Sequence, residues 1–177
     1  TFIKTITDSD ENDPITLIYK AIRTVNNELI LKSRESDDYE GMGTTLVVAS
    51  ITGSVLHVAN IGDSRLYIAG GEIQQITRDH SLVEEMVSMG EIERKDARTH
   101  EQKNIITRAV GASEDVIPDF FNVDLKKGDR ILLCSDGLTN MIEDNVIKYI
   151  IQNNINIEDA GQELIRTANE NGGRDNI

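Results

Sequence analysis

Several residue types are scarce in this 177-residue chain, and each scarcity excludes some classes of protein. A single cysteine, Cys134, excludes an internal disulfide framework and favours a reducing, cytoplasmic compartment. Tryptophan is absent and aromatic residues make up 4% of the chain, so the core has to be built from Ile, Leu, Val and Ala. No run of about 18 apolar residues and no signal peptide occurs, so no membrane association is expected.

Basic residues are also in short supply, because 18 Lys and Arg face 31 Asp and Glu, for a net charge of −13. Such a surface repels phosphate backbones, so nucleic acid is not an expected partner, whereas cations are compatible with it. The length fits one domain. No repeat, low-complexity tract or linker divides residues 1–177, and we expect a single domain over this range.

Short β-rich runs separated by turn residues fill the part of the chain between residues 44 and 77, which predicts an antiparallel meander. Two more strands are expected on either side of the turn "KKGD". Helices are predicted where apolar residues recur at helical spacing or where capping residues mark an end. These helices follow Asp13-Pro14 and Ser81, and cover residues 143–152 and 157–170. The polar segment Glu91–Asn104 has no buried stripe, so we expect a mobile flap.

Three aspartates stand at the ends of predicted strands, beside small or flexible residues. Asp63 interrupts the β-rich stretch "NIGDSRLY", Asp136 follows the buried run "RILLCS", and Asp175 lies in "NGGRDNI", where we expect a new strand to begin. Each has a plain interpretation as a turn residue or a solvated acid. Taken together, they offer the carboxylate ligands that Mg²⁺ or Mn²⁺ prefers, and a cation would offset their mutual repulsion. We expect them to cluster at one rim, with Asp136 in the middle.

Other catalytic devices are not supported by the sequence. A cysteine nucleophile for phosphate chemistry needs an arginine about six positions later, where this chain has Asn140, so Cys134 is expected to be a core thiol. The three histidines show no zinc-ligand spacing. We expect His57 to be structural and His80 to help cap the helix that follows it, while His100 is placed in the polar segment, where it could approach a substrate.

Six blocks in order carry a resemblance to a known family. They are "GMGTTLVVA", "VANIGDSRLY", "ITRDHSLVEEMVSMGEI", "NIITRAVG", "GDRILLCSDGLTNMIED" and "GGRDNI", and they span Gly41–Ile177. This series resembles the protein phosphatase 2C family of metal-dependent Ser/Thr protein phosphatases, and it is most similar to the bacterial members. No catalytic residue beyond the metal ligands is identifiable from the blocks.

The resemblance implies an α+β fold, a four-layer α-β-β-α sandwich of two antiparallel sheets flanked by helices. It also implies hydrolysis of phosphoserine and phosphothreonine in proteins, opposing a Ser/Thr protein kinase in bacterial signalling, through a metal-activated water at a Mn²⁺ or Mg²⁺ centre. By motif, Asp136 and Asp175 correspond to ligands of the two core ions. Asp63 resembles the ligand of a third ion, shared with Asp136, in bacterial relatives.

The chain departs from the family pattern in its N-terminal segment. The family's phosphate-binding arginine segment and its Asp-Gly-x-Gly-Gly motif, whose Asp bridges the two metals, do not occur in these residues. We therefore expect a sandwich that is incomplete at both ends, weak activity or none from this chain alone, and self-association through exposed sheet edges. A non-enzymatic pseudophosphatase or regulatory module on the same fold is the alternative, and a plain β-sandwich binding protein is a third reading.

Overall fold

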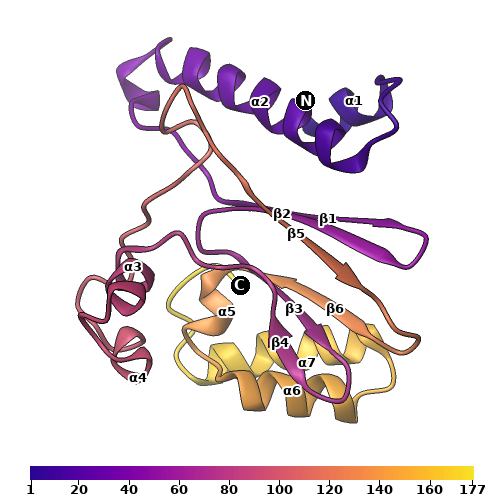
Figure 1. The fold of residues 1–177 in the computed structure, drawn as a ribbon. Helices are drawn as coiled ribbons and strands as arrows, with labels where there is room; N and C mark the ends of the chain where they lie inside the picture. Colours follow the sequence, from indigo (N-terminus) through magenta and orange to yellow (C-terminus); the bar gives the residue numbers. More distant parts are fainter.

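Two three-stranded antiparallel sheets lie face to face between two layers of helices (Figure 1). The computed structural model describes residues 1–177. One sheet has the order β1 (Leu46–Thr52), β2 (Val55–Ile61), β5 (Asp119–Asp124), and the other has the order β4 (Ile73–Gln75), β3 (Arg65–Ala69), β6 (Arg130–Cys134). Helices α1 (Phe2–Thr7) and α2 (Pro14–Ser33) lie over the first sheet, and α6 (Asp144–Asn153) and α7 (Ile157–Glu170) lie over the second. The expected α-β-β-α sandwich is confirmed.

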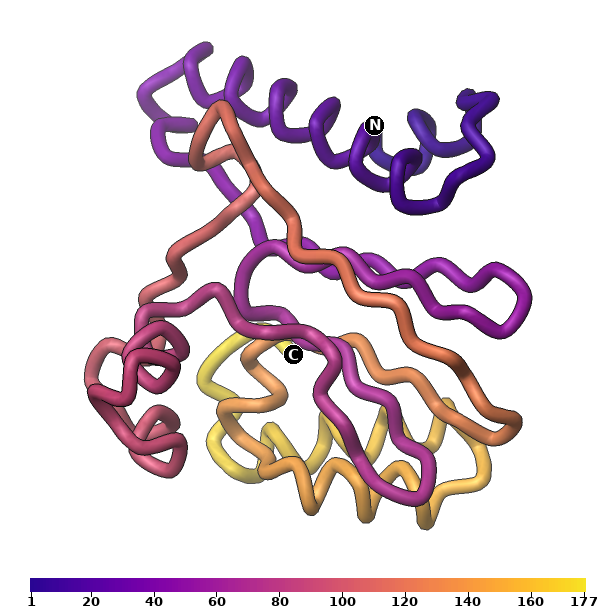
Figure 2. Tube along the Cα trace, in the orientation of Figure 1, coloured from indigo at the N-terminus to yellow at the C-terminus, as the bar shows by residue number.

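The connections between strands differ from the expected meander. β1 pairs with β2 and β3 pairs with β4, but β2 and β3 belong to different sheets. The chain crosses between the sheets at Gly62–Ser64, as the trace in Figure 2 shows. β5 and β6, on either side of "KKGD", are likewise split between the sheets. The meander prediction was wrong because a run of turn residues marks a change of direction but does not say which sheet the next strand joins.

Strand β2 has apolar side chains on both faces, so each face has to be covered by another layer. Leu56 and Val58 pack in the cluster between the sheets, whereas Ala59 and Ile61 pack in the cluster under α2. All four side chains have no exposed surface. A strand with apolar residues on both faces loses contact with water only when a layer covers each face.

Helix α2 forms where the sequence places it. The Asp13 carboxylate accepts a hydrogen bond from the Thr16 amide at 2.8 Å, and Pro14 occupies the first turn. Its buried stripe includes Ile18 and Ile22. Asn26 on this helix is fully buried, and its amide donates to the Ser113 carbonyl oxygen at 2.9 Å, so it ties the helix to the loop before β5.

The remaining elements are short. α3 (Leu82–Met89) begins after Ser81, whose hydroxyl accepts from the Glu84 amide, and ends at Gly90 in the left-handed conformation. α4 (Arg94–Ala97) and α5 (Asp136–Thr139) have four residues each, and η1 (Asp37–Tyr39) is a 3-10 turn. The strand expected at Asp175 is absent, and residues 171–177 form turns and irregular chain. None of the helices has both the length and the apolar character that a membrane span requires.

Candidate metal centre

Asp63 lies in the turn where the chain crosses from one sheet to the other. Gly62 before it has φ of +101°, and a Cβ atom there would come within 2.4 Å of Thr45 Cγ2, so only glycine fits. Partial burial raises the pKa of Asp63 above its usual range, and the charge of Asp136 raises it further. The carboxylate is thus held at the rim beside another acid.

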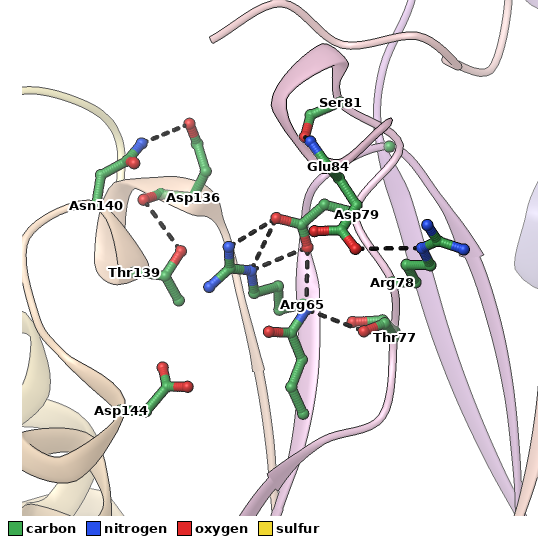
Figure 3. A network of polar contacts seen from close by, with 12 residues as sticks. Arg65, Thr77, Arg78, Asp79, Ser81, Glu84, Asp136, Thr139, Asn140 and Asp144 are labelled. Carbon is green, nitrogen blue, oxygen red and sulfur yellow. Dashed lines mark hydrogen bonds and ion pairs between the residues drawn. The ribbon is translucent and has the colours of Figure 1, made fainter. Parts of the chain in front are cut away.

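Asp136 lies two residues after the end of β6 and is the first residue of α5. Its Oδ2 accepts a hydrogen bond from Asn140 Nδ2 at 3.0 Å (Figure 3). Burial raises the pKa of Asp136, and the neighbouring Asp175 carboxylate adds to this effect. Asp136 opens a single helical turn whose next residue, Gly137, is buried.

Asp175 reaches this rim from the far end of the chain. The Ser135 hydroxyl donates to the Asn176 carbonyl oxygen at 2.8 Å, which anchors this segment beside Asp136. A Cβ atom on Gly137 would lie 3.4 Å from the Asp175 Cβ. The charge of Asp136 acts on Asp63, and the charge of Asp175 acts on Asp136, so the three acids belong to one end of the sandwich. That Asp136 lies in the middle stays a prediction.

The three aspartates are ligands of the type that a divalent cation prefers, but they are not arranged as a complete metal site. All three supply carboxylate oxygens. Burial is the largest cause of the raised pKa values of Asp63 and Asp136, and a neighbouring carboxylate is the second, which a cation would offset. No group of three or more His, Cys, Asp or Glu side chains is arranged so that it could hold a metal ion. This chain therefore offers part of a ligand set.

A cavity of about 440 Å³ opens beside the acids. Asp63 and Asp136 line it, whereas Asp175 and His100 do not. The facing wall comes from the polar segment expected to be a flap, which contributes Arg94, Arg98 and Lys103. Its position beside the rim fits a flap, and its mobility stays a prediction.

Hydrogen bonds tie this segment to the rim. Arg98 donates to the Asn140 carbonyl oxygen at 3.3 Å, and Asn140 in turn holds the Asp136 carboxylate. Arg94 forms an ion pair with Glu84 of α3. The sequence did not predict a place in the site for Arg94, Arg98 or Asn140, because side chains that meet only in the folded chain leave no local pattern.

An ion-pair network centred on Arg65 and Asp79, which both line the cavity, is drawn in Figure 3. Arg65 Nη2 lies 2.7 Å and Nε 2.9 Å from the two carboxylate oxygens of Asp79, so the pair is bidentate. Arg65 Nη1 also donates to the Tyr67 hydroxyl at 3.0 Å, and that hydroxyl donates to Asp144 at 3.1 Å. Burial would lower the pKa of Arg65, but the hydrogen bonds that it donates to Asp79 hold the pKa above its usual range. The network fixes the start of β3, two residues from Asp63.

Cys134 and His80 carry groups that can act in catalysis, but their surroundings in the structure give them other roles. Burial, the largest cause, raises the pKa of the Cys134 thiol to about 12, so the thiol is protonated at neutral pH and is a poor nucleophile. His80 was expected to cap α3, but this prediction was wrong. Ser81 is the N-cap, while His80 is 5% exposed and contacts Gly62 instead.

Replacing Gly137 by alanine is expected to displace the segment that carries Asp175, because the new Cβ would lie 2.3 Å from the Asn176 carbonyl oxygen. Mn²⁺ affinity, measured by isothermal titration calorimetry, should fall about tenfold, the usual size of a disturbance around metal ligands. Gly161→Ala is the matched control, since a Cβ there meets nothing within 4 Å. Equal Mn²⁺ affinities for the two variants would contradict the expectation.

Replacing Asp63 by asparagine is expected to stabilise the chain in EDTA at pH 7.5. The folded state holds a proton on Asp63 more readily than the unfolded state, because its pKa is raised. The free energy of unfolding therefore falls as pH rises from the ordinary Asp pKa, near 3.9, to the raised value, and the full cost is present above it. The gain in Tm should shrink as pH falls towards the ordinary value. Asp10→Asn, at an exposed site, is the control; a lower Tm for Asp63→Asn at pH 7.5 would refute the prediction.

Comparison with known proteins supplies the family. The family model "Protein phosphatase 2C" matches residues 1–176. The chain is 42% identical over 163 residues to the serine/threonine phosphatase stp of Listeria monocytogenes, covering 92% of this chain and 65% of the relative. It is 44% identical over 154 residues to the protein phosphatase PhpP of Streptococcus pneumoniae, covering 86% and 63%. The chain therefore spans less than two thirds of the length of these curated relatives.

Solved structures agree with this similarity. The serine/threonine phosphatase Stp1 of Staphylococcus aureus superposes with a TM-score of 0.89 at 38% identity, covering 97% of this chain and 72% of that one. The catalytic domain of the serine threonine protein phosphatase PstP, in complex with two manganese ions, gives a TM-score of 0.86 at 32% identity, covering 98% and 74%. Since the family model covers nearly every residue and the sandwich is shared, the chain belongs to the protein phosphatase 2C family.

Proposed function

We propose that this chain is part of a metal-dependent phosphatase that hydrolyses phosphoserine and phosphothreonine in proteins. The observation that supports the proposal is that Asp63 and Asp136 line one open cavity, while the Ser135–Asn176 hydrogen bond anchors the segment of Asp175 beside Asp136. Burial, and then a neighbouring carboxylate, raises the pKa of Asp63 and of Asp136, and acids in such a setting are suited to a bound cation.

Within this proposal, Asp136 and Asp175 hold the two core ions, Mn²⁺ or Mg²⁺, and Asp63 with Asp136 holds a third. Bound ions of this kind activate water and neutralise charge on the phosphoryl oxygens. The chain's own residues position the ligands: Asn140 orients Asp136 by its hydrogen bond, and Ser135 anchors the segment of Asp175. The cavity of about 440 Å³ gives a phosphorylated side chain room beside them.

The test is phosphate release from a phosphothreonine peptide with Mn²⁺, using this chain joined to an N-terminal segment that carries the family's Asp-Gly-x-Gly-Gly motif. Asp136→Asn should lower kcat at least about 100-fold, since metal stabilisation is worth several kcal/mol. Asp124→Asn, at an exposed site at the end of β5, should leave kcat unchanged. If the joined chain folds but releases no phosphate, the regulatory-module alternative is favoured, in line with the incomplete ligand set.

Phosphorylated proteins are the proposed partners, with the activity opposing a Ser/Thr protein kinase in the cytoplasm. The expectation that nucleic acid is not a partner rests on the acidic surface, with its net charge of −13. We also propose that residues 1–177 form one domain, because the three apolar clusters follow one another through the stacked layers.

Self-association of the 177-residue chain is a further part of the proposal. β1 and β6 each pair on one side only, and Ile51 on β1 and Leu133 on β6 are 56% and 43% exposed. Free strand edges with apolar side chains pair with other chains. We expect analytical ultracentrifugation to detect concentration-dependent dimers or larger species, and Ile51→Lys to reduce them. Tyr149→Lys, at an exposed apolar residue of helix α6, is the control, and a chain that stays monomeric at every concentration tested would contradict the proposal.

A further inference from the structure

The imidazole of His80 is buried against the turn that carries Asp63, and the proposed chemistry does not use it. The side chain is 5% exposed. Its Nδ1 accepts a hydrogen bond from the Gly62 amide at 3.1 Å, and its Nε2 lies 3.1 Å from Asp119 Oδ2. His80 therefore connects the crossing turn between the sheets to the beginning of β5.

The tautomer follows from these partners. A ring nitrogen that accepts a backbone N–H carries no proton, so Nδ1 is unprotonated and the ring proton lies on Nε2. Nε2 lies 3.1 Å from Asp119 Oδ2 and also 3.2 Å from Arg108 Nη1. A guanidinium only donates, so the acceptor for the Nε2 proton is Asp119, which is ionised. Burial alone would raise the pKa of Asp119, but the hydrogen bonds from His80 and Arg108 outweigh burial and hold the pKa below its usual range. Arg108 donates to the other oxygen of Asp119 at 2.8 Å. Contacts at both ring nitrogens therefore hold the imidazole in one orientation.

The Gly62 peptide is held by its neighbours at both polar atoms. Its N–H donates to the His80 ring, and its carbonyl oxygen accepts from the His80 backbone N–H at 2.9 Å and from Asn60 Nδ2 at 3.3 Å. Two of these three hydrogen bonds come from His80. Because Asp63 is the next residue, its position depends directly on how Gly62 is held.

We infer that His80 is a positioning residue for Asp63: its unprotonated Nδ1 fixes the turn that presents this carboxylate to a divalent cation beside Asp136. The consequence for the cation rests on the proposed function, but the hydrogen bond to Gly62 does not. Residues that orient metal ligands from behind typically change metal affinity 10- to 100-fold when they are replaced.

Two substitutions separate the two ring nitrogens. The side-chain oxygen of His80→Asn can take the place of Nδ1 and accept from Gly62, whereas the amide nitrogen of His80→Gln takes the place of Nε2 and keeps the link to Asp119. We expect hydrogen exchange of the Gly62 amide, measured by NMR on the 177-residue chain, to stay slow in His80→Asn and to accelerate in His80→Gln. Mn²⁺ affinity, measured by calorimetry, should stay within about twofold in the first variant and fall about tenfold in the second. His57→Asn is the control and should change neither quantity, because His57 is a half-buried residue of β2 whose ring contacts Asn122 of β5 and not Gly62.

The outcomes are distinct. Equal Gly62 exchange and equal Mn²⁺ affinity in the two His80 variants would overturn the inference, as would a greater loss in His80→Asn, because a purely structural histidine does not distinguish its nitrogens in this order. Thermal unfolding of each variant shows whether both are folded. If the wild-type chain binds no Mn²⁺, the proposed function fails, and the Gly62 exchange pattern still decides whether His80 holds the turn.

Discussion

The 177-residue chain alone should hydrolyse p-nitrophenyl phosphate at least about 100-fold more slowly than the same chain joined to a segment carrying Asp-Gly-x-Gly-Gly, at saturating Mn²⁺. The reason is coordination. Two divalent ions about 3.5–4 Å apart need a shared carboxylate, and each prefers about six oxygen ligands. The chain brings Asp136 close to Asp63 and Asp175, but no three acidic side chains are arranged to hold an ion.

The joined chain with asparagine in place of the motif's Asp is the matched control, since it restores the length and the fold but not the bridging carboxylate. It should be as slow as the 177-residue chain. Equal rates for the 177-residue chain and the unmodified joined chain would show that the acids present in this chain are sufficient, and the coordination argument would be wrong.

Asp79→Ala should lower the free energy of unfolding by about 3–5 kcal/mol, the usual cost of removing one partner from a buried ion pair. The Asp79 side chain is 12% exposed and that of Arg65 is 26% exposed. Without Asp79 the guanidinium keeps only the Tyr67 hydroxyl as a hydrogen-bond partner, and Gln75 also loses its bond to Asp79. Chemical denaturation followed by circular dichroism measures the change, which corresponds to a Tm lower by about 10 °C.

Glu114→Ala provides the control, because it removes the ion pair with Arg34 in which both side chains are mostly exposed. That loss should be below about 1 kcal/mol. The double variant Arg65→Met/Asp79→Leu should recover most of the stability, since two apolar side chains leave no unpaired charge. A loss for Asp79→Ala no larger than that for Glu114→Ala would show that the pair contributes little.

Local patterns predicted the elements well, because spacing reports directly which side of an element is buried. The stripe of Ile18 and Ile22 indicated α2, and Ser81 with Gly90 indicated both ends of α3. The same patterns failed where the outcome depended on a distant partner. "GDS" looked like a hairpin turn between paired strands, and the strand expected at Asp175 has no neighbouring strand to pair with in the structure.

Some residues of the candidate site could be predicted from the sequence, and others could not. The three aspartates could be selected from the sequence because they share a setting beside small or flexible residues and fall within the six ordered blocks that named the family. The support around them could not be selected. His80 was expected to cap the helix beside it, yet its ring is bound to Gly62 and Asp119, and the partner of Arg65 lies on a different segment, at Asp79.

The sequence by itself determined the α+β class, most helix and strand positions, the acidic surface and the family, because each depends on composition, periodicity or short motifs. Only the tertiary structure decided which strands share a sheet, that Asp63 and Asp136 line one cavity, and that the His80 ring accepts from the Gly62 amide. The physical reason is that burial patterns state how much of a side chain is covered, whereas hydrogen bonds and charge interactions depend on which segments, remote in the chain, come within a few ångströms of one another.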